Sequence, residues 1–193
     1  FTDCSEGNGI YSGVVDAFIK PTGILNPVKV LCNFDYSVTY IQYRKNGDVN
    51  FNRSWSEYEN GFGDVNGDFW LGNKYIRALA QQKNYFLGLR QYTSSWSISS
   101  YPSLAIDSAT NFYALTYGSL ISGTDGLSPA DTSKEAYGQQ FSTYDRDPTG
   151  CAKLHGSGWW YNTGCSLSNL NGNFQVTFGS TTGITQTGIG IYT

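Results

Sequence analysis

Four cysteines, one pair near each end of the chain, restrict the folds open to this sequence more than any other feature. Four cysteines allow three connectivities, and we predict the two pairings between sequence neighbours, Cys4–Cys32 and Cys151–Cys165. A zinc site is the competing interpretation, but the sequence has no C-x-x-C spacing and a single histidine. Two disulfides are typical of an oxidising compartment, so we expect a secreted, extracellular protein.

The start of the chain and one tripeptide agree with secretion. The sequence begins at Phe1 and has no methionine, which predicts that a signal peptide was removed or a domain was trimmed. Asn52-Arg53-Ser54 is an acceptor pattern for N-linked glycans.

The composition indicates a globular protein with a core of rings. Aromatic residues make up 16% of the 193 residues and charged residues only 14%. Glycine occupies 23 positions, which is well above the usual share and predicts many turns. The net charge of −3 argues against a nucleic-acid partner, because such proteins carry a basic surface. The sequence has no apolar stretch of ~18 residues, so we expect no membrane insertion.

Apolar periodicity and turn residues predict an α+β fold in one domain, residues 1–193, because no repeat or long linker divides the chain. We expect a short helix over residues 54–58 capped by Ser54, and a second over residues 74–82 capped by Asn73. Strands are expected at residues 28–32, 38–43, 85–90, 112–116 and 174–178.

Three candidate sites carry chemistry. His155 is the only histidine and no G-x-S-x-G motif accompanies it, so we predict that the protein is not an enzyme. Asp145 and Asp147 could supply oxygens to Ca²⁺, or they could belong to a turn stabilised by their side chains. The tripeptide Trp159-Trp160-Tyr161 could stack on a sugar, although such rings more often form a core under a disulfide.

Several motifs, in order along the chain, carry a resemblance to a known family. They are FNRSW at residues 51–55, GDFWLGN at 67–73, FSTYDRD at 141–147, Cys151-Ala152, WWY at 159–161 and SNLNG at 168–172. In these motifs the sequence resembles the fibrinogen-related domains, which include ficolins, tachylectin-type invertebrate lectins and the globular ends of fibrinogen and angiopoietins. The resemblance implies a twisted, mostly antiparallel sheet with short helices and a loop-rich binding region near the carboxyl end.

The same resemblance implies a binding site beside the second disulfide. In the lectins of the family, the acetyl group of an N-acetylated sugar enters an aromatic pocket next to a calcium loop. The matching positions here are His155, Tyr161, Cys165 and Ser166. The lectins commonly place a cis bond after this cysteine, so that a backbone amide points at the ligand, and the Ser166 amide is the expected donor here.

This sequence departs from the family pattern in three places. The lectins commonly carry Cys-His at the last cysteine, whereas the pair here is Cys165-Ser166. Asp145 and Asp147 are expected to hold Ca²⁺, but the loop before Cys151 is several residues shorter and lacks a third acidic position. The family's final strand has no recognisable counterpart after residue 179. Either the chain has been cut, or a partner or a rearranged tail fills the gap left in the sheet, and an uncovered position there would favour a homo-oligomer.

Two functions follow from the resemblance. The first is a secreted lectin for N-acetylated glycans such as N-acetylglucosamine, acting in innate recognition or agglutination, with glycans or glycoproteins as partners. The alternative is a protein-binding or extracellular-matrix module that has the same fold but does not bind sugar.

Overall fold

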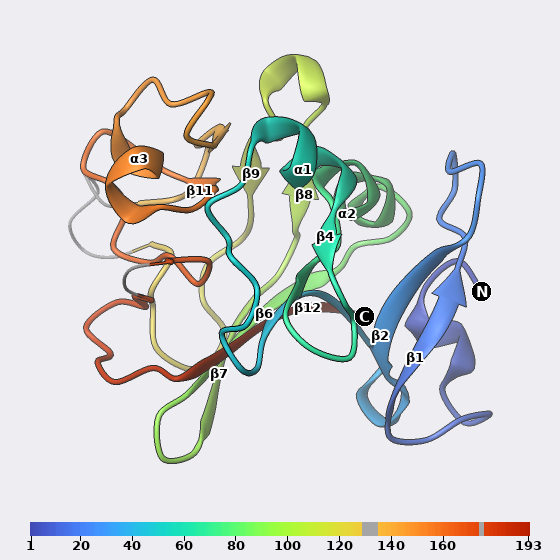
Figure 1. Cartoon of the computed structure of the whole chain (residues 1–193). Coiled ribbons are helices and arrows are strands. Elements are labelled where there is room, and N and C mark those ends of the chain that lie inside the picture. Colours follow the sequence, from blue (N-terminus) through green and yellow to red (C-terminus); the bar gives the residue numbers. More distant parts are fainter. Residues whose placement is uncertain (129–134, 174–175) are drawn as a thin grey trace.

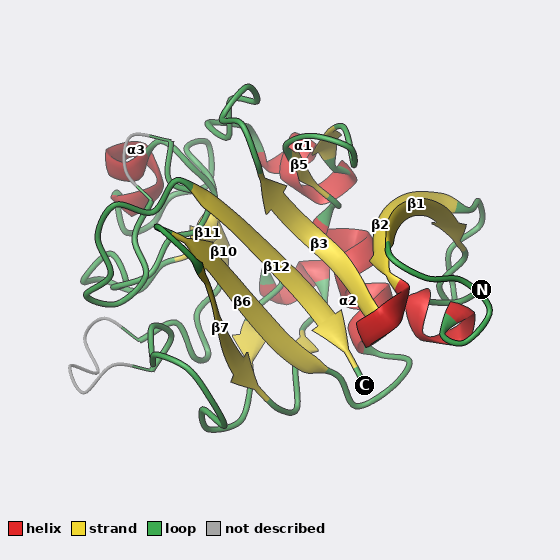
Figure 2. Ribbon diagram, turned by 90° about the horizontal axis from the view of Figure 1, so that it is seen from below, coloured by secondary structure: helices red, strands yellow, loops and turns green. Residues whose placement is uncertain are grey.

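The main sheet is antiparallel and joins strands from both ends of the chain. The computed structural model describes residues 1–128, 135–173 and 176–193. Six strands lie across the sheet in the order β1 (Val14–Ile19), β2 (Val28–Asn33), β3 (Val38–Arg44), β12 (Gln186–Tyr192), β6 (Phe86–Tyr92) and β7 (Trp96–Tyr101). Two short strands, β5 (Phe69–Trp70) on β3 and β4 (Phe62–Gly63) on β5, extend it. Figure 2 shows β3, β12, β6 and β7 side by side.

Short helices and two small sheets complete the α+β fold that the sequence predicts. The helices are α1 (Trp55–Asn60), α2 (Asn73–Ala80) and α3 (Cys151–His155), with 3₁₀ turns η1 (Cys4–Gly7), η2 (Phe34–Tyr36) and η3 (Ala109–Asn111). The small sheets pair β8 (Ala105–Ile106) with β9 (Leu115–Thr116), and β10 (Phe141–Ser142) with β11 (Trp159–Trp160). In Figure 1, α3 and β11 lie at the opposite end of the molecule from the hairpin of β1 and β2. Within the described part of the chain, no helix is long and apolar enough to cross a membrane.

Local sequence signals correctly predict several elements. The strands expected at residues 28–32, 38–43 and 85–90 are β2, β3 and β6. The expected helix at residues 54–58 is α1, and Ser54 caps it as predicted. The Ser54 side chain accepts a hydrogen bond from the Glu57 amide, while the Glu57 carboxylate accepts one from the Ser54 amide. This reciprocal pair satisfies two amides that would otherwise be unpaired at the helix start.

Other boundaries were predicted wrongly. Helix α2 begins at Asn73 itself, because the Asn73 Oδ1 accepts a hydrogen bond from Trp70 Nε1 at 2.9 Å and does not cap the helix. Phe112 and Tyr113 have φ values of +50° and +52°, which a strand does not allow, so only the end of segment 112–116 forms β9. The strand expected at residues 174–178 starts in residues 174–175, outside the described part of the chain.

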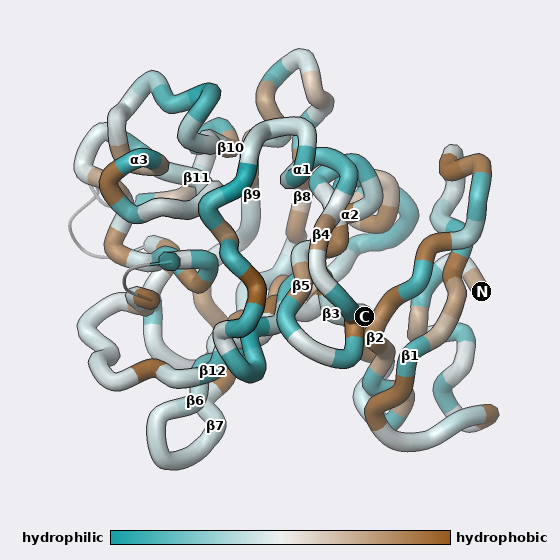
Figure 3. Tube along the Cα trace, viewed as in Figure 1, coloured by the Kyte–Doolittle hydropathy of each residue, from teal (hydrophilic) through white to brown (hydrophobic). Residues whose placement is uncertain are grey.

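Strands β1 and β7 were missed altogether. Strand β1 lies at the sheet edge and leaves Val14 and Phe18 exposed, so its burial follows no alternating pattern. Figure 3 shows the apolar stretches of this outer hairpin.

The end of the chain itself fills the sheet position that the apparently missing final strand would have left open, so of the alternatives the rearranged tail is the correct one. Strand β12 lies between β3 and β6 and pairs with both along its length. Ile189 and Ile191 point into the core. Gly190 lies on the other face, where a Cβ would come within 2.5 Å of Val38 Cγ1. The reason for expecting a second chain at this position therefore disappears, and homo-oligomerisation stays a prediction without that support.

Aromatic side chains fill the core between the sheet and the helices. Tyr58 lies with its ring centroid 5.5 Å from Trp70 and 5.1 Å from Phe141, and Phe141 lies 5.1 Å from Trp160. Trp159 and Trp160 are buried, so the interpretation of these rings as core is correct. Edge-to-face and tilted contacts of this kind add to the gain from burial alone.

A buried amide ties the main sheet to the loops near the carboxyl end. Gln42 on β3 is fully buried, and its Nε2 lies 3.0 Å from the Leu170 carbonyl, 3.1 Å from Asn171 Oδ1 and 2.9 Å from Thr187 Oγ1. Asn171 is also fully buried, and its Nδ2 donates to the Gly158 carbonyl at 3.0 Å. Because buried polar groups are costly unless they are paired, each of these residues depends on the others.

Replacing Gln42 tests this dependence. Gln42→Leu keeps the bulk of the side chain but leaves buried acceptors on residues 170 and 171 short of a donor. We expect the free energy of unfolding to fall by about 1–3 kcal/mol, measured by urea denaturation. The control Gln81→Leu changes an exposed glutamine at the end of α2 and is expected to alter stability by less than about 0.5 kcal/mol. Equal effects of the two substitutions would contradict the role given to Gln42.

Candidate functional site

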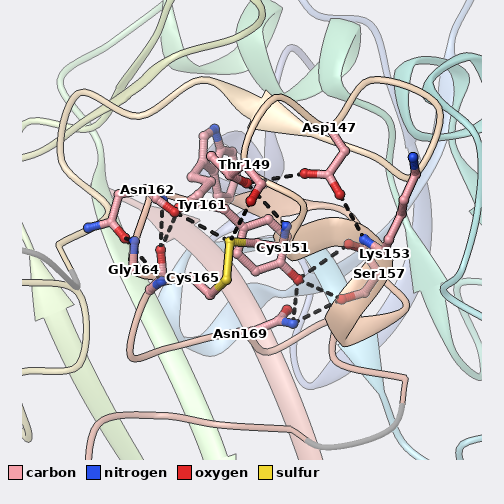
Figure 4. Close-up of a disulfide and its surroundings, with 12 residues drawn as sticks. Asp147, Thr149, Cys151, Lys153, Ser157, Tyr161, Asn162, Gly164, Cys165 and Asn169 are labelled. Carbon is pink, nitrogen blue, oxygen red and sulfur yellow. Dashed lines mark hydrogen bonds between the residues drawn. A yellow bond between two sulfur atoms is a disulfide. The ribbon is translucent and has the colours of Figure 1, made fainter.

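The four residues predicted to bind ligand lie together at one end of the molecule. His155 ends α3, Tyr161 follows β11, and Cys165 and Ser166 lie in the next loop. The Cys151–Cys165 disulfide joins two cysteines separated by 14 positions in the sequence, with their Cα atoms 5.1 Å apart. Figure 4 shows the disulfide and the hydrogen bonds around it. The other expected disulfide, Cys4–Cys32, is also present and ties η1 to β2.

Tyr161 anchors the site from inside. Its side chain is buried, and its hydroxyl lies 3.0 Å from Ser157 Oγ and accepts a hydrogen bond from Asn169 Nδ2 at 2.7 Å. Burial raises the pKa of the Tyr161 hydroxyl well above its usual value, so the group stays protonated. His155 is half-buried and stacks on this ring, with centroids 5.6 Å apart and an interplanar angle of 12°. The two rings form one wall beside the disulfide, and His155 is the partly accessible member.

The Ser166 amide does not point at an open site, which differs from the expectation. The described residues contain no cis peptide bond, and Cys165 and Ser166 instead have φ values of +63° and +49°. In this left-handed turn the Ser166 amide donates to Asn162 Oδ1 at 3.2 Å, and the Ser166 hydroxyl donates to the Trp160 carbonyl at 2.9 Å. Both donors of Ser166 are thus used within the protein.

Asn162 organises this loop and was missed by sequence reasoning. Its Oδ1 accepts from the amides of Gly164 and Ser166, and its Nδ2 donates to the Glu135 carbonyl at 3.0 Å. Asparagine side chains that accept backbone amides two residues on are common in turns. The sequence Asn162-Thr163-Gly164 was therefore a signal for such a turn, but nothing in it indicated the amide of Ser166.

The two candidate calcium ligands hold helices and turns in place. Asp145 Oδ1 accepts from the amide of Trp55, the first residue of α1, at 2.9 Å and from Thr143 Oγ1 at 2.7 Å. Asp147 Oδ2 accepts from the Lys153 amide in α3 at 2.9 Å. Among the described residues, no three histidine, cysteine, aspartate or glutamate side chains gather where they could hold a metal. Ca²⁺ needs six to eight oxygens, and we propose that these two carboxylates, which already accept hydrogen bonds from the protein, do not hold it.

Thermal unfolding in the presence and absence of calcium tests this proposal. An ion that binds only the folded state raises the melting temperature as its concentration exceeds the Kd. Because Asp145 and Asp147 already accept protein hydrogen bonds, we expect the same Tm in millimolar CaCl₂ and in a chelator. A Tm that rises with calcium in the unmodified protein and not in Asp147→Asn would restore the calcium site.

Comparison with known proteins gives a match over nearly the whole chain. The family model described as "Fibrinogen beta and gamma chains, C-terminal globular domain" matches residues 2–191. Mouse Fibrinogen-like protein 1 is 38% identical over 197 residues, which cover 89% of this chain and 60% of that protein. Bovine Angiopoietin-4 is 34% identical over 188 residues, covering 89% of this chain and 36% of that protein. The chain thus spans only part of the length of these relatives.

Solved structures agree with the sequence match. The fibrinogen-like globe domain of human ANGPTL2 is similar with a TM-score of 0.84 and 27% identity, over 99% of this chain and 98% of that one. A lamprey fibrin D-dimer, solved with a Gly-His-Arg-Pro-amide peptide ligand, is similar with a TM-score of 0.91 and 25% identity, over 99% of this chain and 73% of that one. The chain belongs to the family of the fibrinogen C-terminal globular domain, which is not a family of enzymes.

Proposed function

We propose that this domain is an extracellular protein-recognition module. The relatives at the highest identities reported above are a fibrinogen-like protein and an angiopoietin, and the lamprey structure carries a peptide ligand. The two disulfides support an oxidising compartment and hence secretion.

One observation carries the proposal most directly: at the loop-built end, the polar groups expected to contact a sugar are bonded within the protein, while large apolar side chains are exposed. Leu154 on α3 exposes 66% of its surface, and Tyr144, in the turn that Asp145 holds against α1, exposes 41%. Exposed apolar side chains on a rigid support are typical anchors of protein interfaces. The disulfide and the Asp147 contact to α3 supply that support.

Binding to a panel of secreted proteins and receptor ectodomains tests the proposal. The domain is presented as a tetramer to raise avidity, and the panel is read by surface plasmon resonance. We expect at least one ectodomain to bind, and Leu154→Asp to weaken that binding at least about tenfold, or 1.4 kcal/mol. The control Leu25→Asp places the same charge on a residue that is 88% exposed in the N-terminal part, and it should leave binding unchanged. Binding that survives Leu154→Asp would exclude α3 as the contact surface.

A lectin specific for N-acetylated glycans is the second candidate, and one observation favours it. The parallel stack of His155 on Tyr161 beside the second disulfide offers an aromatic wall of the kind that packs against the apolar side of a sugar. Cys165 and Ser166 would then contribute shape, since the Ser166 amide is engaged with Asn162.

A glycan array with the same tetramer separates the two functions. If the lectin proposal holds, N-acetylglucosamine glycans bind and His155→Ala loses most of the signal, because the accessible ring of the stack is gone. Lys153→Ala, which changes an exposed residue of α3 two positions before His155, is the control that should retain binding. An array without a bound glycan, together with a bound ectodomain, would leave protein recognition as the function.

A further inference from the structure

The main sheet has a hollow on the side that its helices do not cover. Figure 2 shows this side, with β3, β12, β6 and β7 toward the viewer and α2 behind them. The hollow has a volume of about 550 Å³ and is bounded by these four strands and by residues next to η2. This volume is within the range of pockets that take small ligands or single side chains. We call it the sheet hollow, and it is distinct from the site at α3.

Glycines form the floor of the sheet hollow. Gly190 on β12 pairs with Gly88 on β6, and Gly88 pairs with Ser100 on β7. A Cβ at Gly88 would lie 3.2 Å from the Tyr192 ring, which is tighter than most side-chain contacts, so a side chain here would displace the ring slightly. A row of small residues across three strands thus lowers the surface, while larger side chains rise on each side.

Arg90 is the only charged residue among the described residues that line the sheet hollow. Its guanidinium lies 4.4 Å from the centroid of the Trp96 ring and 5.7 Å from that of Tyr40. Its Nη1 donates to the Tyr40 hydroxyl, and among the described residues it has no carboxylate partner. The rings hold the guanidinium in place without neutralising it, which leaves a fixed positive charge facing the hollow.

Two polar atoms of the lining are buried without a hydrogen-bond partner. One is the donor Arg90 Nε, and the other is the acceptor Asn33 Oδ1 at the end of β2. Unpaired buried polar atoms are rare in folded proteins, and each one needs an explanation. Solvent reaches neither atom, so the group that the lining offers to a ligand is the rest of the Arg90 guanidinium.

We propose that the sheet hollow binds the carboxylate of an aspartate or glutamate in an acidic segment of a protein partner, with an adjacent apolar residue of that segment on the rim. A guanidinium matches a carboxylate with two parallel hydrogen bonds. The rim supplies Tyr36 and Ile98, which are 73% and 48% exposed. This inference rests on the proposed protein-recognition function and assigns it a second contact surface.

The charge of the site argues against other anions. A sulfated polysaccharide or a nucleic acid is held by rows of cations, and the lining has one cation in a chain of net charge −3. A neutral sugar would leave the fixed charge unused. A single carboxylate with an apolar neighbour uses both the charge and the rings.

Titration with two short peptides tests the site without any natural partner. The probes are acetyl-Glu-Phe-amide and acetyl-Gln-Phe-amide, which differ only in the charged group. They are added to the ¹⁵N-labelled domain and followed by NMR at the Arg90 Nε–H and the Trp96 indole N–H. We expect the glutamate peptide to shift both signals and to bind at least about tenfold more tightly than the glutamine peptide. Equal affinities, or shifts confined to other parts of the domain, would overturn the proposal.

Two substitutions assign the effect to the hollow. Ile98 pairs with Arg90 across β6 and β7, and it is exposed, so Ile98→Asp places a carboxylate beside the guanidinium without removing it. We expect Ile98→Asp to abolish binding of the glutamate peptide, and the neutral isostere Ile98→Asn to weaken it much less. Arg90→Gln should also abolish it, whereas Arg53→Gln, which removes a charge paired with Glu57 beside α1, should not. Binding that survives both Arg90→Gln and Ile98→Asp would refute the assignment even if the domain recognises proteins elsewhere.

The ectodomain panel then separates this proposal from the proposed function. One outcome is that ectodomain binding is lost in Leu154→Asp but unchanged in Ile98→Asp, and that the two peptides bind with equal affinity. This outcome would uphold protein recognition and reject the sheet hollow as a site. Peptide discrimination with no bound ectodomain would uphold the hollow as a carboxylate site and reject the wider function.

Discussion

A chain of buried amides connects the centre of the main sheet with the disulfide-braced end of the molecule. The Gln42 side chain on β3 donates a hydrogen bond to Asn171 Oδ1. The Asn171 backbone amide donates to Asn169 Oδ1, and Asn169 Nδ2 donates to the Tyr161 hydroxyl. All four side chains are buried. In a buried environment, a polar group that loses its hydrogen-bond partner destabilises the fold by more than a paired group stabilises it. The segment 157–171 therefore has few alternative arrangements, even though most of it is neither helix nor strand.

This network explains how an irregular region can present a defined surface. The Cys151–Cys165 bond restrains the loop from outside, and Asn162 binds two of its amides from inside. Asp145 and Asp147 connect the preceding turns to α1 and α3. A cation in this region would need the same carboxylates. In this structure they instead accept amides at the starts of the two helices, and so hold the preceding turns against them. The accessible side chains include Tyr144 and Leu154 beside charged residues such as Arg146 and Lys153, a mixture that suits recognition of a folded partner.

Strand β12 serves both faces of the sheet in different ways. Its isoleucines face the core, where burial of apolar surface stabilises the fold. Its glycines face the other way, where their lack of a side chain lets Val38 and the neighbouring rings approach the backbone. Strand β12 therefore completes the hydrophobic core with one face and contributes to the floor of the sheet hollow with the other.

Local signals in the sequence were enough for the family, both cysteine pairings, strands β2, β3 and β6, and the capped helix α1, because each depends on residues close together in the chain or on a motif read directly. The position of β12 was not readable, since alternating glycine and isoleucine resembles a loose tail until β3 and β6 supply the partners on either side. Likewise, the sequence placed His155, Tyr161, Cys165 and Ser166 in one region. Only the tertiary structure decided that Asn162 takes the Ser166 amide and that Asp145 and Asp147 cap helices. The hydrogen-bond partner of a polar group is the complementary group that lies about 3 Å away from it. For these residues, the packing of segments far apart in the chain decides which group that is.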